Sequence, residues 1–465
     1  MKKNKTSLNK FFLSVWIIFL FLLTAYSVYI LLDSPQLALN QQPHTGQIIP
    51  YISFRIILGI YFFIAILSIK KLFTNKIALG IIILTGIVCR VILIPSQPVL
   101  EDDYYRYLWD GAVTANGFNP YLFSPEDAIS DSTDIPAEIR QLAKESNGII
   151  KNINHPHVRT IYPALAQGVF AFSYMLAPWQ SWMWKLILFV FDIAVLFFLL
   201  LILKHFRYPL ILLSIYWLNP IVIHEFFNAA HMDLLAVLFV IISIYLYLKN
   251  NYWLAIVCLA IATGLKLWPI VLLALFLRSF WNDKHTFGLY FLGYFTIVLI
   301  LFIPVLTSGL NESLGFVRYA ERWVNNAAVY SLFRDAIFYF TNLIGVYINI
   351  LPRVVITLVY LIILYLIVKR ETKSQDQFLE RVLLAVAFLY LISPTQFPWY
   401  YTWMIPLLVF RPRVSLLLYA VLLPLYQLNY LSPALVYVQH LPVLVVFLWE
   451  LKFKRTDFLF FTEIT

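Results

Sequence analysis

An acidic and aromatic segment at residues 101–111 holds the side chains best suited to chemistry. It opens with three consecutive carboxylates, Glu101, Asp102 and Asp103, and continues Tyr-Tyr-Arg-Tyr-Leu-Trp-Asp-Gly. At helical spacing the aromatic and apolar side chains share one face, which predicts a helix lying on a membrane surface. Carboxylates at the N-terminus of such a helix interact favourably with the positive end of its dipole, so they have a purely structural interpretation. The functional interpretation makes one of them a general base or a metal ligand.

Lys266 is the first candidate partner for an anionic substrate. It stands in a Lys-Leu-Trp-Pro turn between apolar stretches, where a charge is costly unless it is paired or functional. We expect it to bind an anionic group, and the alternative is a lysine that snorkels to the membrane interface. The other predicted substrate contacts in the polar segments are Arg106, Asp110, Arg159 and Tyr162.

His231 and Asp233 form a second polar pair, two residues apart in the chain. They suit either the chelation of a divalent ion or contacts to substrate hydroxyl groups, and we expect substrate contact. Two local ligands do not complete a metal site, so no metal ligand is predicted and a divalent ion is left open. Asp192 lies in the middle of an apolar stretch, where it is either a coupling site of a transporter or a buried structural contact. Arg90 and Lys185, near helix ends, are expected to snorkel.

The composition places these residues in a membrane protein. Of 465 residues, 62% are apolar and only 12% are charged, whereas soluble domains are about 25% charged. A soluble enzyme is therefore excluded, as is a disulfide-stapled scaffold, because the chain has only two cysteines. The excess of basic residues does not indicate nucleic acid, because these residues cluster between apolar runs as they do in cytoplasmic loops.

Apolar runs of about 20 residues predict an all-α polytopic bundle of about 12 to 14 transmembrane helices in a single domain, residues 1–465. The expected spans are 11–32, 50–69, 77–95, 182–203, 209–224, 233–248, 252–277, 286–306, 352–368, 381–396, 399–410, 414–431 and 435–450. Residues 252–277 are expected to break at Lys266 and Pro269, and 161–177 to be re-entrant or interfacial. Short basic connections, among them 70–76, and both termini are assigned to the cytoplasm. The long loops 96–181 and 307–351, which carry interfacial helices, then face outward, where we expect function.

Several short motifs resemble those of a known enzyme superfamily. Asp102 before an aromatic helix, Asp110 eight residues later, and the turn Gly117, Pro120 and Tyr121 resemble the first active-site loop of the glycosyltransferase-C superfamily. The likeness is to polyprenol-phosphate-mannose-dependent mannosyltransferases, including glycosylphosphatidylinositol mannosyltransferase I and glycosyltransferase family 87. Further similar segments are Asn154-His155-Pro156, Thr160-Ile161-Tyr162-Pro163-Ala164-Leu165-Ala166, Asn228-Ala229-Ala230-His231-Met232-Asp233, Lys266-Leu267-Trp268-Pro269 and Pro398-Trp399-Tyr400. The Asp-x-Asp form of the superfamily is replaced by adjacent carboxylates, so both Asp102 and Asp103 are candidates for the base, with Asp102 preferred.

The resemblance implies an inverting hexosyltransferase of the cell envelope. It would move a hexose, expected to be mannose, from a polyprenyl-phosphate donor to a lipid- or glycan-linked acceptor, with an Asp as general base. The implied partners are that donor, that acceptor and membrane lipids, with no nucleic acid; a bacterial inner membrane with an extracytoplasmic active site is the expected location. The alternatives are a polytopic transporter or lipid flippase, or a non-catalytic subunit of an envelope polysaccharide complex.

Overall fold

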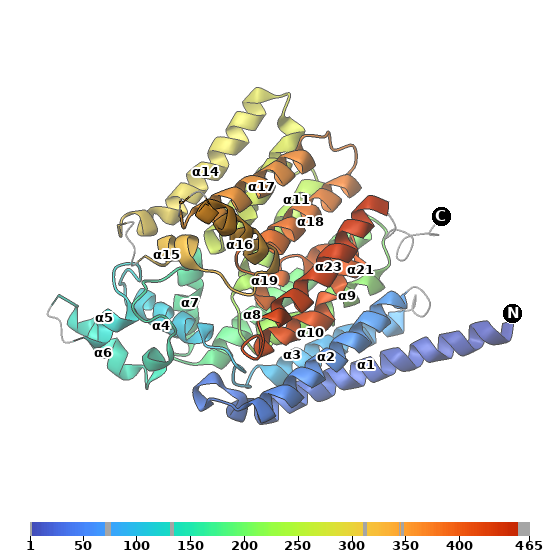
Figure 1. Ribbon diagram of the computed structural model, residues 1–465, viewed down its shortest axis with the longest axis horizontal. Coiled ribbons are helices and arrows are strands. Elements are labelled where there is room, and N and C mark those ends of the chain that lie inside the picture. The colour runs from blue at the N-terminus through green and yellow to red at the C-terminus, as the bar shows by residue number, and fades with distance from the viewer. Residues whose placement is uncertain are drawn as a thin grey trace.

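The computed structural model describes residues 2–69, 76–130, 134–309, 314–343, 345 and 348–453, with side chains from residue 10 onward. This part of the chain is helical and contains no strand. Seven of its helices are long and apolar enough to cross a membrane. They are α1 (Lys2–Leu37), α2 (Thr45–Leu67), α3 (Lys76–Leu93), α8 (Ser181–His205), α14 (Lys284–Leu306), α17 (Leu351–Val368) and α23 (Ala434–Phe453) (Figure 1). An all-α polytopic membrane fold is thus confirmed.

The other predicted spans are shorter or broken. η4 (Leu210–Leu213) and α9 (Ser214–Trp217) form one continuous segment, which is bent by 50° against α10 (Pro220–Phe227). If the segment and α10 are counted as one span, they make an eighth crossing. The predicted spans 233–248 and 252–277 become α11 (Asp233–Leu248) and α12 (Tyr252–Leu265), of 16 and 14 residues. The described residues therefore hold seven or eight long spans, fewer than the 12 to 14 expected.

Proline and polar residues account for these shorter helices. The chain breaks after α12 at Lys266, as expected, and continues as η5 (Trp268–Leu272), α13 (Leu273–Leu277) and η6 (Arg278–Phe280). Toward the C-terminus α18 (Gln375–Ile392) precedes several single turns; Pro398 is the first residue of one of them and Pro406 the second residue of another. These turns are α19 (Pro398–Tyr401), α20 (Ile405–Leu408), α21 (Val414–Leu417), α22 (Tyr419–Leu422) and η7 (Leu423–Leu428). They are largely buried in protein, where broken helices are tolerated at membrane depth.

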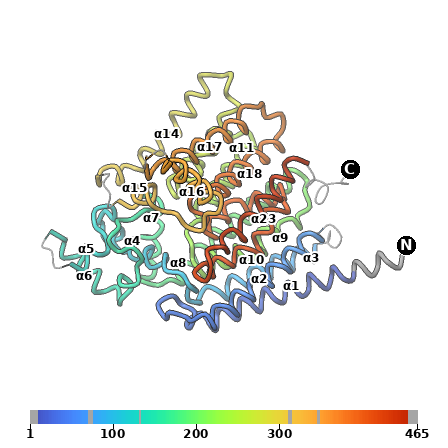
Figure 2. Tube along the Cα trace, in the orientation of Figure 1, coloured from blue at the N-terminus to red at the C-terminus, as the bar shows by residue number. Residues whose placement is uncertain are grey.

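The first long loop and the beginning of the second fold at one side of the bundle. Residues 96–181 form α4 (Asp103–Ala115), α5 (Pro125–Ile129), α6 (Ala137–Glu145), η3 (Ile149–Asn152) and α7 (Ala164–Leu176). Elsewhere, a short turn, η1 (Leu39–Gln41), follows α1. The second loop forms α15 (Gly315–Arg322) and α16 (Ala328–Leu343). α4 to α7 and α15 lie at the left of Figure 2, away from the end of α23. The predicted connection 70–76 lies almost wholly outside the described residues, as do residues 310–313, 344 and 346–347 of the second loop.

The α4 helix forms where it was expected, but protein surrounds it instead of a membrane surface. Every residue from Tyr104 to Val113 is buried, and α7 packs along it. Gly111 permits this packing, because a Cβ there would lie 2.5 Å from the carbonyl oxygen of Phe170. The amphipathic pattern therefore marks a helix buried inside the protein, and the expectation of a helix lying on the membrane was wrong.

Three charged residues of the spans, Arg90, Asp192 and Lys185, are buried and have polar partners. Arg90 and Asp192 form an ion pair with neither side chain exposed, and Tyr216 donates to the same carboxylate. Lys185 is also fully buried and donates to the carbonyl oxygen of Ser96 over 2.6 Å. Snorkelling of Arg90 and Lys185 was a wrong prediction, because each finds a polar partner inside the bundle.

Candidate active site

A cavity of about 640 Å³ opens among the two long loops and the broken helices. Its volume lies within the usual range of small-molecule sites, about 300–1,000 Å³. Its wall includes residues 100–103 before and within α4, the segment 154–163, and the break at 266–271. The far wall is aromatic and comes from α15, from α19 and its neighbours, and from η7: Phe316, Tyr319, Trp323, Phe397, Trp399, Tyr400, Trp403 and Tyr426.

The acidic residues at the start of α4 divide two roles between them. Glu101 Oε1 accepts hydrogen bonds from the backbone N–H groups of Asp102 and Asp103, both over 3.1 Å, and so caps the helix. Asp102 itself makes no capping hydrogen bond. Asn154 Nδ2 donates to Asp102 Oδ1 over 2.7 Å and to Asp103 Oδ1 over 3.2 Å. All three carboxylates line the cavity, but the structural interpretation applies to Glu101 alone, because it caps the helix.

The protein environment makes these carboxyl groups stronger bases than usual. Burial raises the pKa of Asp102, and the neighbouring charges of Glu101 and Asp103 raise it further. Burial likewise raises the pKa of Glu101, against the effect of the two backbone N–H donors. The pKa of Asp103 is raised to about 6, chiefly by burial and Glu101, while His231 lowers it. A carboxyl group whose pKa lies nearer to neutrality is suited to accept a proton.

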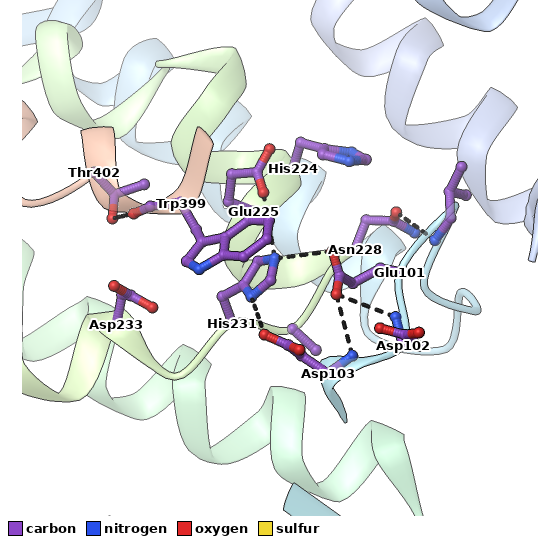
Figure 3. Close-up of polar contacts among 12 residues, drawn as sticks. Glu101, Asp102, Asp103, His224, Glu225, Asn228, His231, Asp233, Trp399 and Thr402 are labelled. Atoms are coloured by element: carbon purple, nitrogen blue, oxygen red, sulfur yellow. Dashed lines mark hydrogen bonds and ion pairs between the residues drawn. The ribbon is translucent and has the colours of Figure 1, made fainter. Parts of the chain in front are cut away.

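His231 lies behind the acidic residues and has no exposed surface. Its Nε2 is 3.3 Å from Glu101 Oε2 and 3.5 Å from Glu225 Oε2, and its Nδ1 is 3.9 Å from Asp103 Oδ2. The ring stacks on the Trp399 indole, with centroids 3.9 Å apart and planes inclined by 18° (Figure 3). Burial lowers the pKa of the imidazole, although the surrounding carboxylates act in the opposite direction.

Lys266 brings a cation to the cavity wall. Its Nζ donates to Asp233 Oδ1 over 2.6 Å, and the side chain is 18% exposed. The ammonium lies 4.4 Å from the centroid of the Tyr400 ring and 5.5 Å from that of Trp403. Asp233 is the first residue of α11, is 1% exposed and accepts a second hydrogen bond from Trp403. Asp233 therefore lies behind the wall and holds Lys266 and Trp403 in place.

The remaining predicted contacts also divide into residues that line the cavity and a residue that lies behind its wall. Arg106, Arg159 and Tyr162 line the cavity. Arg106 forms an ion pair with Asp110 over 2.9 Å and donates to the Val158 carbonyl oxygen. Asp110 is 1% exposed and also accepts from Gln167, so it supports Arg106 from behind. Arg159 donates to the carbonyl oxygen of Tyr121, which ties the first loop together.

The structure thus brings Asp102, Asp103, Lys266, Arg106, Arg159 and Tyr162 to one cavity and places His231, Asp233 and Asp110 directly behind it. Sequence reasoning gave no role to Asn154, which bridges Asp102 and Asp103, or to Trp399, although both stand in the motifs noted above. It missed the aromatic wall of Tyr319, Trp403 and Tyr426 altogether. Nothing in the local sequence distinguishes these rings from the many aromatic residues of the membrane interface.

One group of side chains among the described residues has the composition of a metal site. One nitrogen of His231 and one oxygen each of Glu101 and Asp103 lie within 4.8 Å of one another. His231 and Asp233, expected from the sequence to contact substrate together, instead have separate partners, because Asp233 pairs with Lys266.

The fold and the site define a polytopic helical membrane protein whose polar cavity combines carboxylates, a lysine and aromatic rings. Residues 31–282 match the MptA/B family, described as "Alpha-(1->6)-mannopyranosyltransferase, N-terminal domain". Because this match spans more than half of the chain, the protein belongs to that mannosyltransferase family. The matched range contains every predicted site residue from Asp102 to Lys266, whereas the aromatic residues of α19 lie beyond it. No curated protein and no solved structure matches the chain.

Proposed function

We propose that this protein is an inverting mannosyltransferase that uses a polyprenyl-phosphate-linked mannose. It transfers the mannosyl group to a hydroxyl group of a lipid- or glycan-linked acceptor, forming the α-(1→6) linkage that the family description names. The observation that carries the proposal is the cavity itself, whose wall holds the carboxylates of Asp102 and Asp103 together with the ammonium of Lys266.

Asp102 is the proposed general base. Its carboxylate lines the cavity and is held by Asn154, whereas Asp103 also faces His231. In the reaction, the acceptor oxygen attacks the anomeric carbon and gives its proton to Asp102. The bond from the anomeric carbon to the phosphate oxygen breaks, and the polyprenyl phosphate leaves with the bonding electrons. Attack opposite to the leaving group inverts the anomeric carbon, so an α-linked product requires a β-linked mannosyl phosphate.

Lys266 is the proposed partner of the phosphate. It is a cation on the cavity wall, and its ammonium has three donors, of which Asp233 takes one. A fixed positive charge stabilises the negative charge that develops on the departing phosphate. Arg106 and Arg159 lie on the same wall, but their guanidinium groups are engaged with protein oxygens.

The aromatic wall suits the sugar and the acceptor. Tyr319, Trp399, Tyr400 and Tyr426 present flat apolar rings to the cavity beside hydroxyl groups. Aromatic rings with polar edges contact the apolar faces of a sugar while their hydroxyl groups donate hydrogen bonds. The cavity lies among the loops assigned to the outer side, so we propose an extracytoplasmic reaction, in a bacterium at the inner membrane.

The test is transfer of labelled mannose from β-linked polyprenyl-phosphate mannose by the purified protein, with a membrane-lipid extract as acceptor. We expect Asp102→Asn to lower the rate by at least about a hundredfold, since general-base catalysis contributes about 10²–10⁴-fold. The labelled product should be cleaved by an α-mannosidase and not by a β-mannosidase.

Glu138→Gln is the matched control, because Glu138 is an exposed carboxylate of the same loop that does not line the cavity. It should transfer mannose at the wild-type rate. Equal rates for wild type, Asp102→Asn and Glu138→Gln would refute the assignment of Asp102, and a β-linked product would refute inversion of a β-linked donor.

A further inference from the structure

The buried imidazole of His231 lacks the hydrogen bonds that such a group ordinarily has. Its side chain has no exposed surface, and within the described part of the chain neither ring nitrogen has a hydrogen-bond partner. Buried polar groups are nearly always satisfied, so this exception requires an explanation. Both nitrogens point at carboxylate oxygens, those of Glu101 and Glu225 on one side and that of Asp103 on the other (Figure 3).

The shorter of the two contacts to the acidic segment is longer than an ordinary hydrogen bond and lies within the range of separations between two ligands of one metal ion. Nε2 lies 3.3 Å from Glu101 Oε2, and Nδ1 lies 3.9 Å from Asp103 Oδ2. Ligands bonded to zinc at about 2.0–2.2 Å stand roughly 3–3.5 Å apart. These two contacts use different ring nitrogens, and a single ion can bind only one of them. One nitrogen of His231 and one oxygen of each carboxylate lie within 4.8 Å of one another, which is the grouping that such an ion needs.

The oxygens that face His231 are distinct from those that hold the local structure. Glu101 caps α4 through Oε1 and turns Oε2 toward the imidazole. Asp103 accepts from Asn154 through Oδ1 and turns Oδ2 toward the same ring. Each carboxylate is therefore oriented by one oxygen and presents the other, as outer hydrogen bonds orient the ligands of metal sites.

The two segments that carry these ligands are fixed to each other. Asn228 Oδ1 accepts from the backbone N–H of Val99 over 3.1 Å, and Asn228 Nδ2 donates to the Gln97 carbonyl oxygen over 2.7 Å. The backbone N–H of His231 donates to the Glu225 carbonyl oxygen over 2.9 Å. The stacked indole of Trp399 fixes the plane of the ring. Ligands from two segments are thus held in one arrangement before any ion binds.

We propose that Glu101, Asp103 and His231 bind one divalent transition-metal ion, Mn²⁺ or Zn²⁺, at the edge of the cavity. An imidazole with two carboxylates suits these ions, whereas Mg²⁺ prefers a shell of oxygen ligands alone. The ion would offset the charge of neighbouring acidic groups that are removed from water. Metal binding is measured without sugar transfer, so this proposal stands or falls independently of the proposed reaction.

The experiment is calorimetric titration of the purified, EDTA-treated protein in detergent with Mn²⁺, Zn²⁺ and Mg²⁺ separately, with the bound metal counted by mass spectrometry. We expect one equivalent of Mn²⁺ or Zn²⁺ per chain, bound at least tenfold more tightly than Mg²⁺. Asp103→Asn and His231→Phe should each weaken binding at least tenfold. Asp103→Asn preserves shape, so it carries the test if His231→Phe does not elute as a monodisperse protein.

The controls are His157→Phe and Glu138→Gln, which remove an exposed imidazole and an exposed carboxylate of the same loop. Both should bind the ion as the wild type does, and Asp102→Asn should retain it within about threefold while losing transfer. The proposal is overturned if the wild type binds neither ion stoichiometrically, or if Asp103→Asn binds as tightly as the wild type.

Discussion

The ammonium of Lys266 and the carboxylate of Asp233 form an ion pair of 2.6 Å, with Lys266 on the wall of the cavity and Asp233 behind it. The pair joins the break after α12 to the first residue of α11. Asp233 is almost completely buried, whereas Lys266 keeps part of its side chain at the cavity. The lysine is therefore oriented from behind and presents its charge forward, which is the arrangement that an anion site requires.

Replacement of Lys266 tests whether this charge serves the donor phosphate. We expect Lys266→Met to lower kcat/KM for the polyprenyl-phosphate donor by about a hundredfold, because a donor aimed at a developing charge contributes about that much. Lys266→Arg should retain more activity, since the positive charge remains. The measurement is initial rates over a range of donor concentrations.

A double variant separates this role from a merely structural one. Removing one partner of a buried ion pair leaves the other charge uncompensated and destabilises the protein. If Lys266 served only to neutralise Asp233, Lys266→Met combined with Asp233→Asn would recover transfer. We expect the double variant to recover thermal stability in detergent while transfer stays low.

Arg90 and Asp192 provide a second prediction, on stability alone. The pair is fully buried in α3 and α8, with Tyr216 as a further donor to the carboxylate. Asp192→Asn or Arg90→Met should lower the free energy of unfolding by about 3–5 kcal/mol, because each leaves a buried charge without its partner. The pair of substitutions together should cost less than the sum of the two. Thermal unfolding in detergent, monitored by tryptophan fluorescence, gives the comparison.

The same variants distinguish an enzyme from a transporter. A coupling site must exchange its proton or ion with water, whereas Asp192 has no exposed surface and is bound on two sides. We expect the fraction of Asp192→Asn that remains folded to transfer mannose at the wild-type rate. If folded Asp192→Asn protein transferred mannose more slowly than folded wild type, a purely structural role for this carboxylate would be contradicted.

The sequence predicts the class of the fold and much of the cavity wall for local reasons. Apolar runs require helices, and the proline beside Lys266 requires a break. The same break exposes the lysine, and the turn before α4 exposes Asp102 and Asp103. These are properties of neighbouring residues, so a single sequence contains them.

The sequence does not show which distant segments contact one another. His231 lies against Glu101 and Asp103 because Asn228 joins its loop by hydrogen bonds to the segment before α4. Arg90 meets Asp192 because α3 and α8 both pack against α10. The sequence also leaves open which apolar stretches form one long helix. Among the described residues seven or eight spans are long, and the other apolar stretches are divided into shorter helices.

The side of the membrane on which the cavity lies is a third prediction. Positive charges in the short connections assign those connections to the cytoplasm and the long loop 96–181 to the outer face. Two exposed positions report on the two sides: Glu138 in α6 of the long loop, and Lys373 between α17 and α18.

We expect Glu138→Cys to react with a membrane-impermeant maleimide in intact cells, and Lys373→Cys to react only after the membrane is permeabilised. The two native cysteines are replaced by serine in both variants, so that any label reports on the new thiol. Labelling of Lys373→Cys but not Glu138→Cys in intact cells would reverse the orientation. The cavity would then open to the cytoplasm, and a donor presented there would have to replace the one proposed.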